Sequence, residues 1–222
     1  MRFDILTIFP KILDSYFNES ILARAQKNKL IQIKTHDIRA AAIDKRKTVD
    51  DTPYGGGPGM VIQIEPVYKT LKKIYKTKNK STRVILLTPR GETLTQNKVK
   101  ELSKYKRLIL IAGHYEAIDA RIDNFIDEKI SLGNFILTGG ELAAASVVDA
   151  VSRLVPKVLG KAASLEEESF SHFNAKTGEF NVEYPQYTRT EVFKGLAVPK
   201  VLLSGNHREI ARWRQEVSRT KK

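Results

Sequence analysis

Hydrophobic positions in the first third of the chain alternate between strand-like runs and helical stripes. The run RFDILTIF, residues 2–9, is rich in β-branched and aromatic residues, and LIQIKTHDI, residues 30–38, alternates apolar with polar positions. Both patterns are typical of β-strands. Apolar residues recur at helical spacing after Pro10 and again from Pro66 to Lys76. The pattern therefore predicts two strands and two helices in this region.

Three further segments share one layout, in which a short apolar run leads into a glycine turn. They are RVILLTPRG at 83–91, RLILIAGHYEAID at 107–119 and NFILTGGELAAAS at 134–146. Continuous apolar runs separated by helical segments predict a parallel α/β sheet, and such sheets bind ligands beyond the carboxyl ends of their strands. One such turn alone is ordinary punctuation between a strand and a helix. Three in succession favour a cofactor pocket, although no GxGxxG follows the first strand and no GxxxxGK[ST] occurs.

A helix is predicted after Gly140. Another face of this helix, away from its apolar stripe, carries Ser146, Asp149 and Arg153, and a solvated polar face is the usual explanation of such a trio. Pro156 ends the helix directly after Arg153, so this side chain is expected where a second chain or segment can reach it. The apolar stripe consists of Val147, Val148, Val151, Leu154 and Val155.

The segment DDTPYGGGPGM, residues 50–60, is either a linker, a structural turn or a binding loop. Flexible linkers are usually rich in Gly and Ser and lack an aromatic residue or a buried anchor, whereas Tyr54 lies inside this segment and an apolar run follows it. Glycines allow the backbone to approach a ligand closely, while Pro53 and Pro58 restrict the shapes of the loop. The pattern favours the binding loop slightly over the structural turn.

The composition changes between Ala162 and Val182, where the sequence becomes polar and begins with a run of acidic residues. This segment is predicted to be a linker. Beyond it, EVFKGL at 191–196 and SGNHREIARWRQEVSRTKK at 204–222 are predicted to be helical. The second of these carries a basic stripe, which is either a solvated face or a phosphate contact surface. The stripe consists of Arg208, Arg212 and Arg219.

Length, charge and cysteine content narrow the class of protein. A chain of 222 residues with 41% hydrophobic content is long enough for one main domain and a small appendage. Its net charge of +13 favours a polyanionic partner, and nucleic acid is favoured over a membrane because neither terminus forms a basic amphipathic helix with an aromatic face. The start MRFDILTIFP is too short an apolar run for a signal peptide or a membrane span, so a cytoplasmic location is expected. The chain has no cysteine and no close histidine spacing, which disfavours a dedicated metal site.

Seven sequence blocks carry a resemblance to a known family. They are VDDTPYGGGPGM, LTPRG, AGHYEAID, LTGGEL, DAVSRLVPKVLG, EYPQYTR and LLSGNHREIARWR. In this order they closely resemble the bacterial tRNA (guanine-N1)-methyltransferases, which methylate N1 of guanosine 37 beside the anticodon. The resemblance covers essentially the whole chain, and seven ordered blocks are a far more specific signal than a lone glycine motif.

The resemblance implies a SPOUT fold, an α/β parallel sheet whose C-terminal part threads a trefoil knot, with a small helical C-terminal domain. Residues 1–161 are then expected to form the S-adenosylmethionine-binding knot domain, 162–182 the interdomain linker and 183–222 a shortened tRNA-binding domain. Family members are homodimers whose active site is built from both subunits. The expected partners are tRNA and a second copy of the chain, and the resemblance leaves open whether Mg²⁺ assists.

The motif matches also imply site residues. Glu183 in EYPQYTR would be the general base, and Arg153 would stabilise negative charge developing on guanine O6. The implied cofactor-binding positions are Leu87, Thr88, Pro89, Gly113, Leu132, Gly133, Leu137, Gly139 and Gly140. The implied substrate-binding positions are Asp50, Tyr54, Gly55, Gly56, Gly57, Pro58, Gly59, Met60, Tyr115, Glu116, Arg208 and Arg212.

Two other functions stay open. A ribose 2′-O-methyltransferase of the same superfamily would share the knot but methylate a sugar hydroxyl, and the EYPQYTR and PYGGGPGM blocks favour the base methyltransferase. A noncatalytic RNA-binding protein would need basic charge alone, and the presence of Arg153 and Glu183 argues against it.

Overall fold

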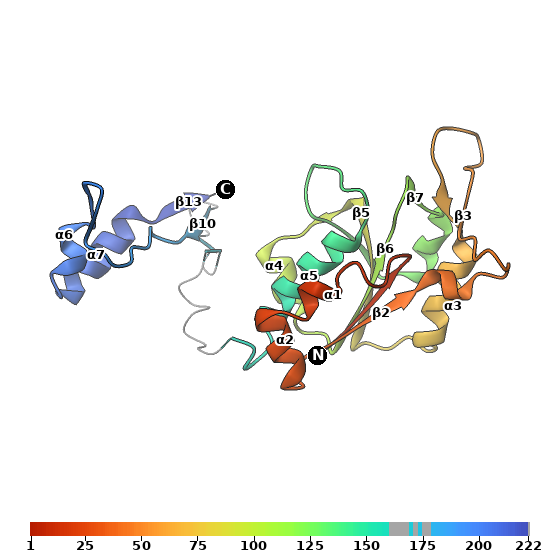
Figure 1. Ribbon diagram of the computed structural model, residues 1–222, viewed down its shortest axis with the longest axis horizontal. Coiled ribbons are helices and arrows are strands. Elements are labelled where there is room, and N and C mark those ends of the chain that lie inside the picture. Colours follow the sequence, from red (N-terminus) through yellow and green to blue (C-terminus); the bar gives the residue numbers. More distant parts are fainter. Residues whose placement is uncertain (160–168, 171–172, 175–178, 222) are drawn as a thin grey trace. The chain divides into compact units, whose positions relative to one another are not determined.

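The computed structural model describes residues 1–159, 169–170, 173–174 and 179–221, which belong to two units (Figure 1). The first unit spans Met1–Gly160 and the second Lys161–Lys222. Most of the predicted linker, residues 162–182, lies outside the described residues. Within the described residues, none of the helices combines the length and the apolar character needed to cross a membrane.

A five-stranded parallel sheet forms the centre of the first unit, as the apolar runs predicted. Its strand order is β2-β1-β6-β5-β8. The strands are β1 (Arg2–Thr7), β2 (Gln32–Asp37), β5 (Thr82–Thr93), β6 (Arg107–Ala112) and β8 (Glu128–Ser131). All five strands run in the same direction, so the loops that follow them gather at one edge, the carboxyl edge, and the turns that precede them gather at the other, the amino edge.

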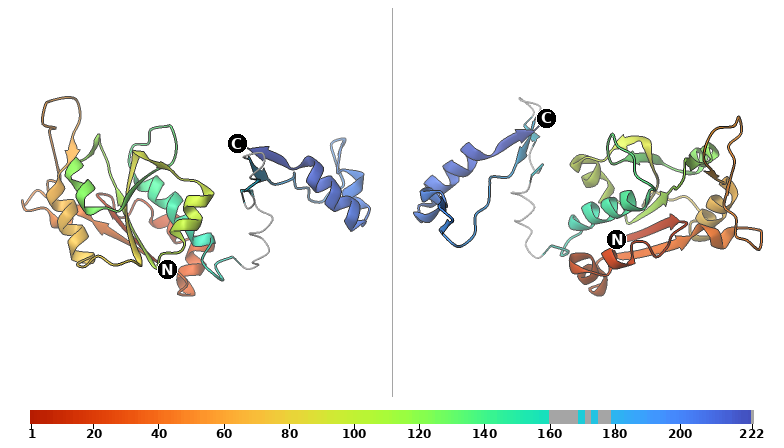
Figure 2. Two further views of the ribbon diagram at one scale, coloured as in Figure 1. Left: turned by 180° about the vertical axis from the view of Figure 1, so that it is seen from behind. Right: turned by 45° about the horizontal axis from the view of Figure 1, so that its top comes forward.

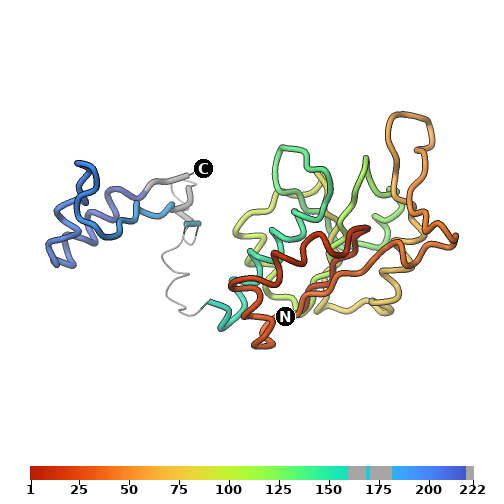
Figure 3. The backbone as a smooth tube through the Cα atoms, in the orientation of Figure 1, coloured from red at the N-terminus to blue at the C-terminus, as the bar shows by residue number. Residues whose placement is uncertain are grey.

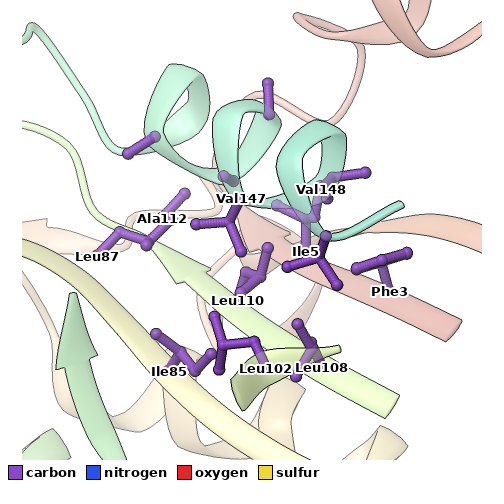
Figure 4. Close-up of a cluster of buried hydrophobic side chains, with 14 of the residues drawn as sticks. Phe3, Ile5, Ile85, Leu87, Leu102, Leu108, Leu110, Ala112, Val147 and Val148 are labelled. Carbon is purple, nitrogen blue, oxygen red and sulfur yellow. The ribbon is translucent and has the colours of Figure 1, made fainter. Parts of the chain in front are cut away.

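Helices cover both faces of the sheet (Figure 2). Alternating side chains of β1 supply both cores, because Phe3 and Ile5 pack toward α5 while Leu6 lies in the cluster on the other face (Figure 4). Each fully buried side chain of this size contributes about 1.5–3 kcal/mol to folding. One face is covered by α1 (Asp14–Phe17), α2 (Ser20–Lys27), α4 (Gln96–Leu102) and α5 (Glu141–Arg153), and the other by α3 (Ile64–Ile74) and two 3-10 helices, η1 (Ile38–Ala41) and η2 (Ala120–Phe125).

One charged residue, Asp4, is completely buried in β1. Its carboxylate accepts hydrogen bonds from Arg2 Nε at 2.7 Å and Arg107 Nε at 2.7 Å, and lies 2.6 Å from His36 Nε2. Burial opposes ionisation of Asp4, but the hydrogen bonds with His36, Arg2 and Arg107 outweigh it and hold the pKa of this carboxyl well below its usual range. The cluster ties β2, β1 and β6 together.

Two predictions for the first unit are wrong in detail. The segment NFILTGGELAAAS does not begin with a strand, since residues 132–140 form a loop and the edge strand is β8 just before it. Its apolar run is exposed rather than buried, with Ile136 81% accessible. The helix predicted after Pro10 is divided into α1 and α2, and Ser20 at the start of α2 has a left-handed φ of 51°.

The second unit is part helical and part β. The predicted closing helix is confirmed as α7 (His207–Val217), which the Asn206 side chain caps by accepting from Arg208 N at 3.1 Å and Glu209 N at 3.3 Å. A short helix, α6 (Lys200–Leu203), precedes it. Strand β10 (Glu179–Val182) pairs with β9 (Phe173–Asn174) and with β13 (Arg219–Lys221), so Arg219 lies beyond the helix that carries Arg208 and Arg212.

The helix predicted for EVFKGL is also wrong. This segment is a hairpin of β11 (Val192–Phe193) and β12 (Leu196–Ala197). Lys194 and Gly195 form its two-residue turn with φ of 45° and 81°. Two successive residues with positive φ are typical of a type I′ turn, whose twist matches that of the flanking strands. A glycine at the second position adopts this conformation without strain.

Candidate active site

Three loops come together at the carboxyl edge of the sheet (Figure 3). They are 88–91 within β5, 113–116 after β6 and 132–140 after β8. Gly140 N donates to Gly113 O at 2.7 Å, and His114 pairs with Gly139 in an isolated antiparallel bridge. The structure therefore brings predicted cofactor residues of the second and third loops into direct contact.

The first loop is a bulge in β5. Leu87 and Glu92 both pair with Ile130, so the four residues between them leave the ladder. A Cβ at Gly91 would lie 2.6 Å from Ile130 Cα, a distance that no side chain tolerates. Glycine is thus required for β5 to return to β8 after the bulge. As a result, Thr88 and Pro89 are presented at the edge of the sheet while Leu87 is buried.

The second and third loops approach each other backbone to backbone. A Cβ at Gly140 would lie 2.9 Å from Ala112 Cα and 3.0 Å from Gly113 N. A side chain at Gly139 would overlap with both His114 and Glu141. Loops without side chains at these points allow a ligand to approach the backbone closely.

A buried polar network that the sequence analysis missed lies beneath these loops. Glu141, in the first turn of α5, is 3% exposed, and its Oε1 accepts a hydrogen bond from Thr7 Oγ1 at 2.7 Å. Its Oε2 lies 3.6 Å from His114 Nδ1. The helix N-terminus stabilises the carboxylate. Thr7 and Glu141 are 134 residues apart, so no sequence spacing indicates that they meet.

The predicted substrate loop is joined to the 113–116 loop at its base. Strand β4 (Val61–Ile62) pairs with β3 (Asp50–Asp51) on one side and with β7 (Ala117–Ile118) on the other. Glu116 N donates to Met60 O at 3.2 Å, and a Cβ at Gly59 would lie 2.5 Å from Glu116 Cγ. These contacts bring together the predicted substrate residues Asp50, Gly59, Met60 and Glu116.

Tyr115 has a second anchor. It adopts a left-handed φ of 62°, and its hydroxyl accepts from Arg39 Nη2 at 3.3 Å. The same guanidinium donates to Lys47 O at 3.5 Å, so Arg39 lies between the 113–116 loop and the segment that leads to β3. Sequence reasoning did not identify Arg39, because it is one of many basic residues and no motif marks it.

The tip of the substrate loop is free of the remaining described chain. Tyr54 is fully exposed, and a Cβ at Gly55, Gly56 or Gly57 would meet nothing within 4 Å. The three glycines have positive φ values of 86°, 77° and 121°. Only the base of the loop is held, so the tip can close over a ligand that binds at the carboxyl edge. This geometry fits a binding loop better than a packed structural turn.

Arg153 lies away from the loops that carry the predicted cofactor residues. It is the last residue of α5, a helix that begins directly after the Gly139–Gly140 loop. A helix of 13 residues is about 20 Å long. Within one chain, α5 therefore separates Arg153 from the predicted cofactor loops by most of the depth of the sheet.

Glu183 belongs to the second unit. Its side chain is exposed, and its backbone N donates to Ser169 Oγ at 3.0 Å. The following segment is held against α7 by Arg214, whose guanidinium lies 4.6 Å from the centre of the Tyr184 ring. On the same helix Arg208 is exposed and Arg212 Nε bonds to Glu216 Oε1 at 2.8 Å. The unit thus carries a carboxylate and two exposed guanidinium groups.

Metal-ligating side chains do not cluster in the part of the chain that the structure describes. There, no group of three or more His, Cys, Asp or Glu residues is placed to hold a metal ion.

Comparison with known proteins extends over nearly the full chain. A family model described as tRNA (Guanine-1)-methyltransferase TrmD matches residues 1–222. The chain is 48% identical over 219 residues to the tRNA (guanine-N(1)-)-methyltransferase of Ruminiclostridium cellulolyticum, covering 98% of this chain and 91% of that protein. It is 51% identical over 216 residues to the protein of the same name from Chloroflexus aurantiacus, and the match covers 97% of this chain and 82% of that protein. The crystal structure of tRNA (m1G37) methyltransferase from Aquifex aeolicus matches with a TM-score of 0.78 and 39% identity, covering 96% of this chain and 87% of that one.

Proposed function

Because this chain belongs to the tRNA (guanine-1)-methyltransferase family, we propose that it transfers a methyl group from S-adenosylmethionine to N1 of guanosine 37 in tRNA. The observation that carries the proposal is the gathering of the 88–91, 113–116 and 132–140 loops at one edge of a parallel sheet, in a chain that matches the family from end to end. The guanosine 37 position is stated for the protein from Aquifex aeolicus and is here a proposal.

The cofactor is proposed to lie between these three loops. The close backbone approach at Gly139 and Gly140 leaves amide and carbonyl groups free of side chains, which fits an adenosyl group and a methionine moiety. S-adenosylmethionine would supply a methyl group already activated by its sulfonium. The chain's own residues then need to orient the guanine and remove its N1 proton. Leu87, Thr88 and Pro89 form one wall of the proposed pocket, and Leu132 to Gly140 form the opposite wall.

A trefoil knot in this region is also proposed. After β8 at the edge of the sheet, the 132–140 loop passes β5 to reach Gly113 at the end of β6, and α5 then packs against β6 and β1. The chain therefore passes β5 and reaches β6 before α5 begins. Such a path supports threading of the following segment through a preceding loop.

Glu183 is the proposed general base and Arg153 its electrostatic partner. The Glu183 carboxylate accepts the proton from guanine N1, which leaves an electron pair on N1 for the new bond to the methyl carbon as the bond from that carbon to sulfur breaks. Negative charge moves to guanine O6 at the same time, and the Arg153 guanidinium stabilises it. The substrate loop, from Tyr54 to Met60, closes over the base from the side of Tyr115 and Glu116.

A homodimer is also proposed, and the position of Arg153 supports it. Since α5 places Arg153 about 20 Å from the cofactor loops of its own subunit, the guanidinium reaches a cofactor site only in a second copy. An exposed apolar surface suitable for that contact lies on the face of α1 and α5, which a hydrogen bond from Tyr16 to Asp149 joins. Its members are Phe9, Ile12, Tyr16, Leu142 and the Phe135–Leu137 run, all at least 37% accessible.

Mapping of the methylated nucleotide tests the proposed reaction. The full chain is incubated with unmodified tRNA and S-adenosylmethionine, and nuclease digestion with mass spectrometry locates the new methyl group. We expect 1-methylguanosine at position 37. A ribose-methylated product would instead support the 2′-O-methyltransferase, and tRNA that binds but gains no methyl group would support the noncatalytic alternative.

A further inference from the structure

The amino edge of the sheet carries a second basic surface, which the proposed reaction does not use. Lys29 lies before β2, Lys76 and Lys80 lie before β5, and Lys104 and Lys106 lie before β6. All five side chains are exposed. We call these five lysines the amino-edge surface. In a parallel sheet they converge although the chain separates them by up to 77 residues, the interval from position 29 to position 106.

Backbone hydrogen bonds show that the turns bearing these lysines are neighbours. Lys106 N donates to Ser81 O at 2.9 Å, and Arg2 N donates to Lys106 O at 2.9 Å. Gln32 N donates to Met1 O at 2.9 Å, which continues the row to β2. From β2 to β5 the edge covers three strand spacings, about 14 Å.

Acidic residues at this edge are already neutralised. Asp4 is paired with two arginines, and Asp127 Oδ1 lies 2.6 Å from Lys78 Nζ. Glu128 contacts Arg83 Nε at 2.7 Å and Lys98 Nζ at 3.3 Å. Within the described residues, none of the five lysines of the amino-edge surface forms an ion pair. Their positive charge is therefore not offset locally.

The chemistry of the surface fits a phosphate backbone rather than bases. Lysine ammonium groups act as mobile point charges that bind phosphates without reading sequence. A row of about 14 Å is long enough to contact more than one phosphate of an RNA backbone. The aromatic rings in these turns already have partners. Arg83 lies 5.7 Å from the centre of the Tyr105 ring, and the Tyr75 hydroxyl accepts from Asn79 N at 2.8 Å, so neither ring stands free to stack with bases.

We propose that the amino-edge surface binds the ribose-phosphate backbone of the tRNA at a point outside the anticodon arm. The inference rests on the proposed function, because it takes tRNA as the RNA. A six-residue strand is about 20 Å long, so the amino edge of a subunit lies that far from its own cofactor loops. A contact there adds affinity without taking part in methyl transfer.

A double substitution, Lys104→Gln with Lys106→Gln, tests the inference. Its matched control is Lys69→Gln with Lys129→Gln, which removes the same charge from two lysines that pair with Glu65 at 2.7 Å and Asp123 at 2.6 Å. The equilibrium dissociation constant for full-length tRNA is measured across a salt series. Each lost phosphate contact lowers the magnitude of the slope of log K against log salt concentration by about one. The slope of the test variant should therefore be smaller by about two, and that of the control should change far less.

Equal slopes for the test variant and the control would overturn the inference. So would an unchanged tRNA slope together with loss of binding to anionic phospholipid vesicles, which would assign the surface to a membrane. An isolated anticodon stem-loop should bind both variants equally. If the test variant's salt slope with the stem-loop were smaller by about two, that result would contradict a contact outside the anticodon arm.

The two proposals fail in different ways. Both variants should methylate a saturating stem-loop at the wild-type rate, and thermal unfolding verifies that they are folded. If the wild-type chain methylates no RNA, the proposed function is wrong, whereas the salt slope with tRNA still reports on the amino-edge surface.

Discussion

At the scale of single residues, the proposed chemistry depends on the exposed carboxylate of Glu183. Glu183→Gln keeps the size of the side chain but cannot accept the guanine N1 proton. We expect the single-turnover rate of methylation to fall by about 10²- to 10⁴-fold, the usual contribution of a positioned base. The affinity for S-adenosylmethionine should change little. Rapid-quench kinetics and calorimetry measure the two quantities.

Glu191→Gln is the matched control for that experiment. Glu191 is also exposed in the second unit, and only its backbone carbonyl, which accepts from Val198 N at 2.9 Å, has a contact within the described residues. Its substitution should leave the rate unchanged. Near-wild-type turnover by Glu183→Gln would reject the assigned base.

Asp4 predicts how the stability of the first unit responds to acid. The pKa of Asp4 is lowered in the folded chain, so its stabilising effect is complete above the unfolded value of about 3.9 and is lost as the pH falls toward the folded value. Asp4→Asn removes the charge that Arg2 and Arg107 face. It should lower the free energy of unfolding at neutral pH by about 1–3 kcal/mol, because the partly exposed guanidinium groups of Arg2 and Arg107 then lack their anion.

Urea unfolding at pH 7, 5 and 3 checks this expectation. The wild-type chain should lose stability most steeply below about pH 4, while Asp4→Asn, which has no carboxyl there to protonate, should show a smaller change. Equal losses below pH 4 in both proteins would show that other carboxyl groups account for acid unfolding.

At the scale of elements, the bulge in β5 requires a glycine at position 91. A Cβ at Gly91 would lie against the Ile130 backbone, so Gly91→Ala must separate β5 from β8 or move the Thr88–Pro89 corner. We expect a loss of about 1–3 kcal/mol in the free energy of unfolding, typical of overpacking. S-adenosylmethionine affinity should fall as well. Denaturant titration and calorimetry give both values.

Gly113→Ala provides the comparison. A Cβ at Gly113 would approach only the Ile118 side chain, at 3.3 Å, which can shift by a few tenths of an ångström. This variant should lose less stability than Gly91→Ala. The reverse order would contradict the role given to the bulge.

Sequence patterns identified strands whose residues are buried one after another, and they missed strands that are only partly buried. The runs in β5 and β6 are buried on both faces and were predicted, whereas β8 is short and charged at its start and was missed. Phe135 to Leu137 were taken for a core strand because they are apolar, but they are exposed. The hairpin at 192–197 depends on two left-handed residues, which hydrophobic periodicity does not reveal.

The candidate site shows the same division between local and long-range information. Glycine turns located the edge of the sheet at which the loops gather, and motif matches supplied individual residues. The contact of Thr7 with Glu141 and that of Arg39 with Tyr115 join residues far apart in the chain. Only the folded structure shows these pairs, because neither has a characteristic spacing.

At the scale of the whole molecule, the length of α5 predicts a site shared between two subunits. Glu183→Gln and Arg153→Ala should each be nearly inactive as homodimers. In a mixed dimer, we expect about half of the wild-type turnover, because Glu183 and Arg153 of one site are proposed to come from different subunits. One composite site would then carry both substitutions and the other neither. Co-expression with two different tags and tandem purification isolates the mixed dimer for single-turnover assays.

A verified mixed dimer without activity would show that one subunit supplies both residues to a site. Light scattering of the wild-type chain gives an independent check, because a monomer that binds S-adenosylmethionine normally would contradict the shared site. A mixed dimer of Glu191→Gln with Arg153→Ala controls for the effect of tagging.

The opposite edges of the sheet have a consequence for how such an enzyme evolves. The cofactor loops follow the strands and the amino-edge lysines precede them, so no turn contributes to both. A lineage in which the salt concentration around the protein changes can gain or lose lysines at the amino edge while the loops proposed to hold the methyl donor stay unchanged. Selection on tRNA affinity and selection on the rate of methyl transfer then act on separate parts of the gene, so each property can change without the other.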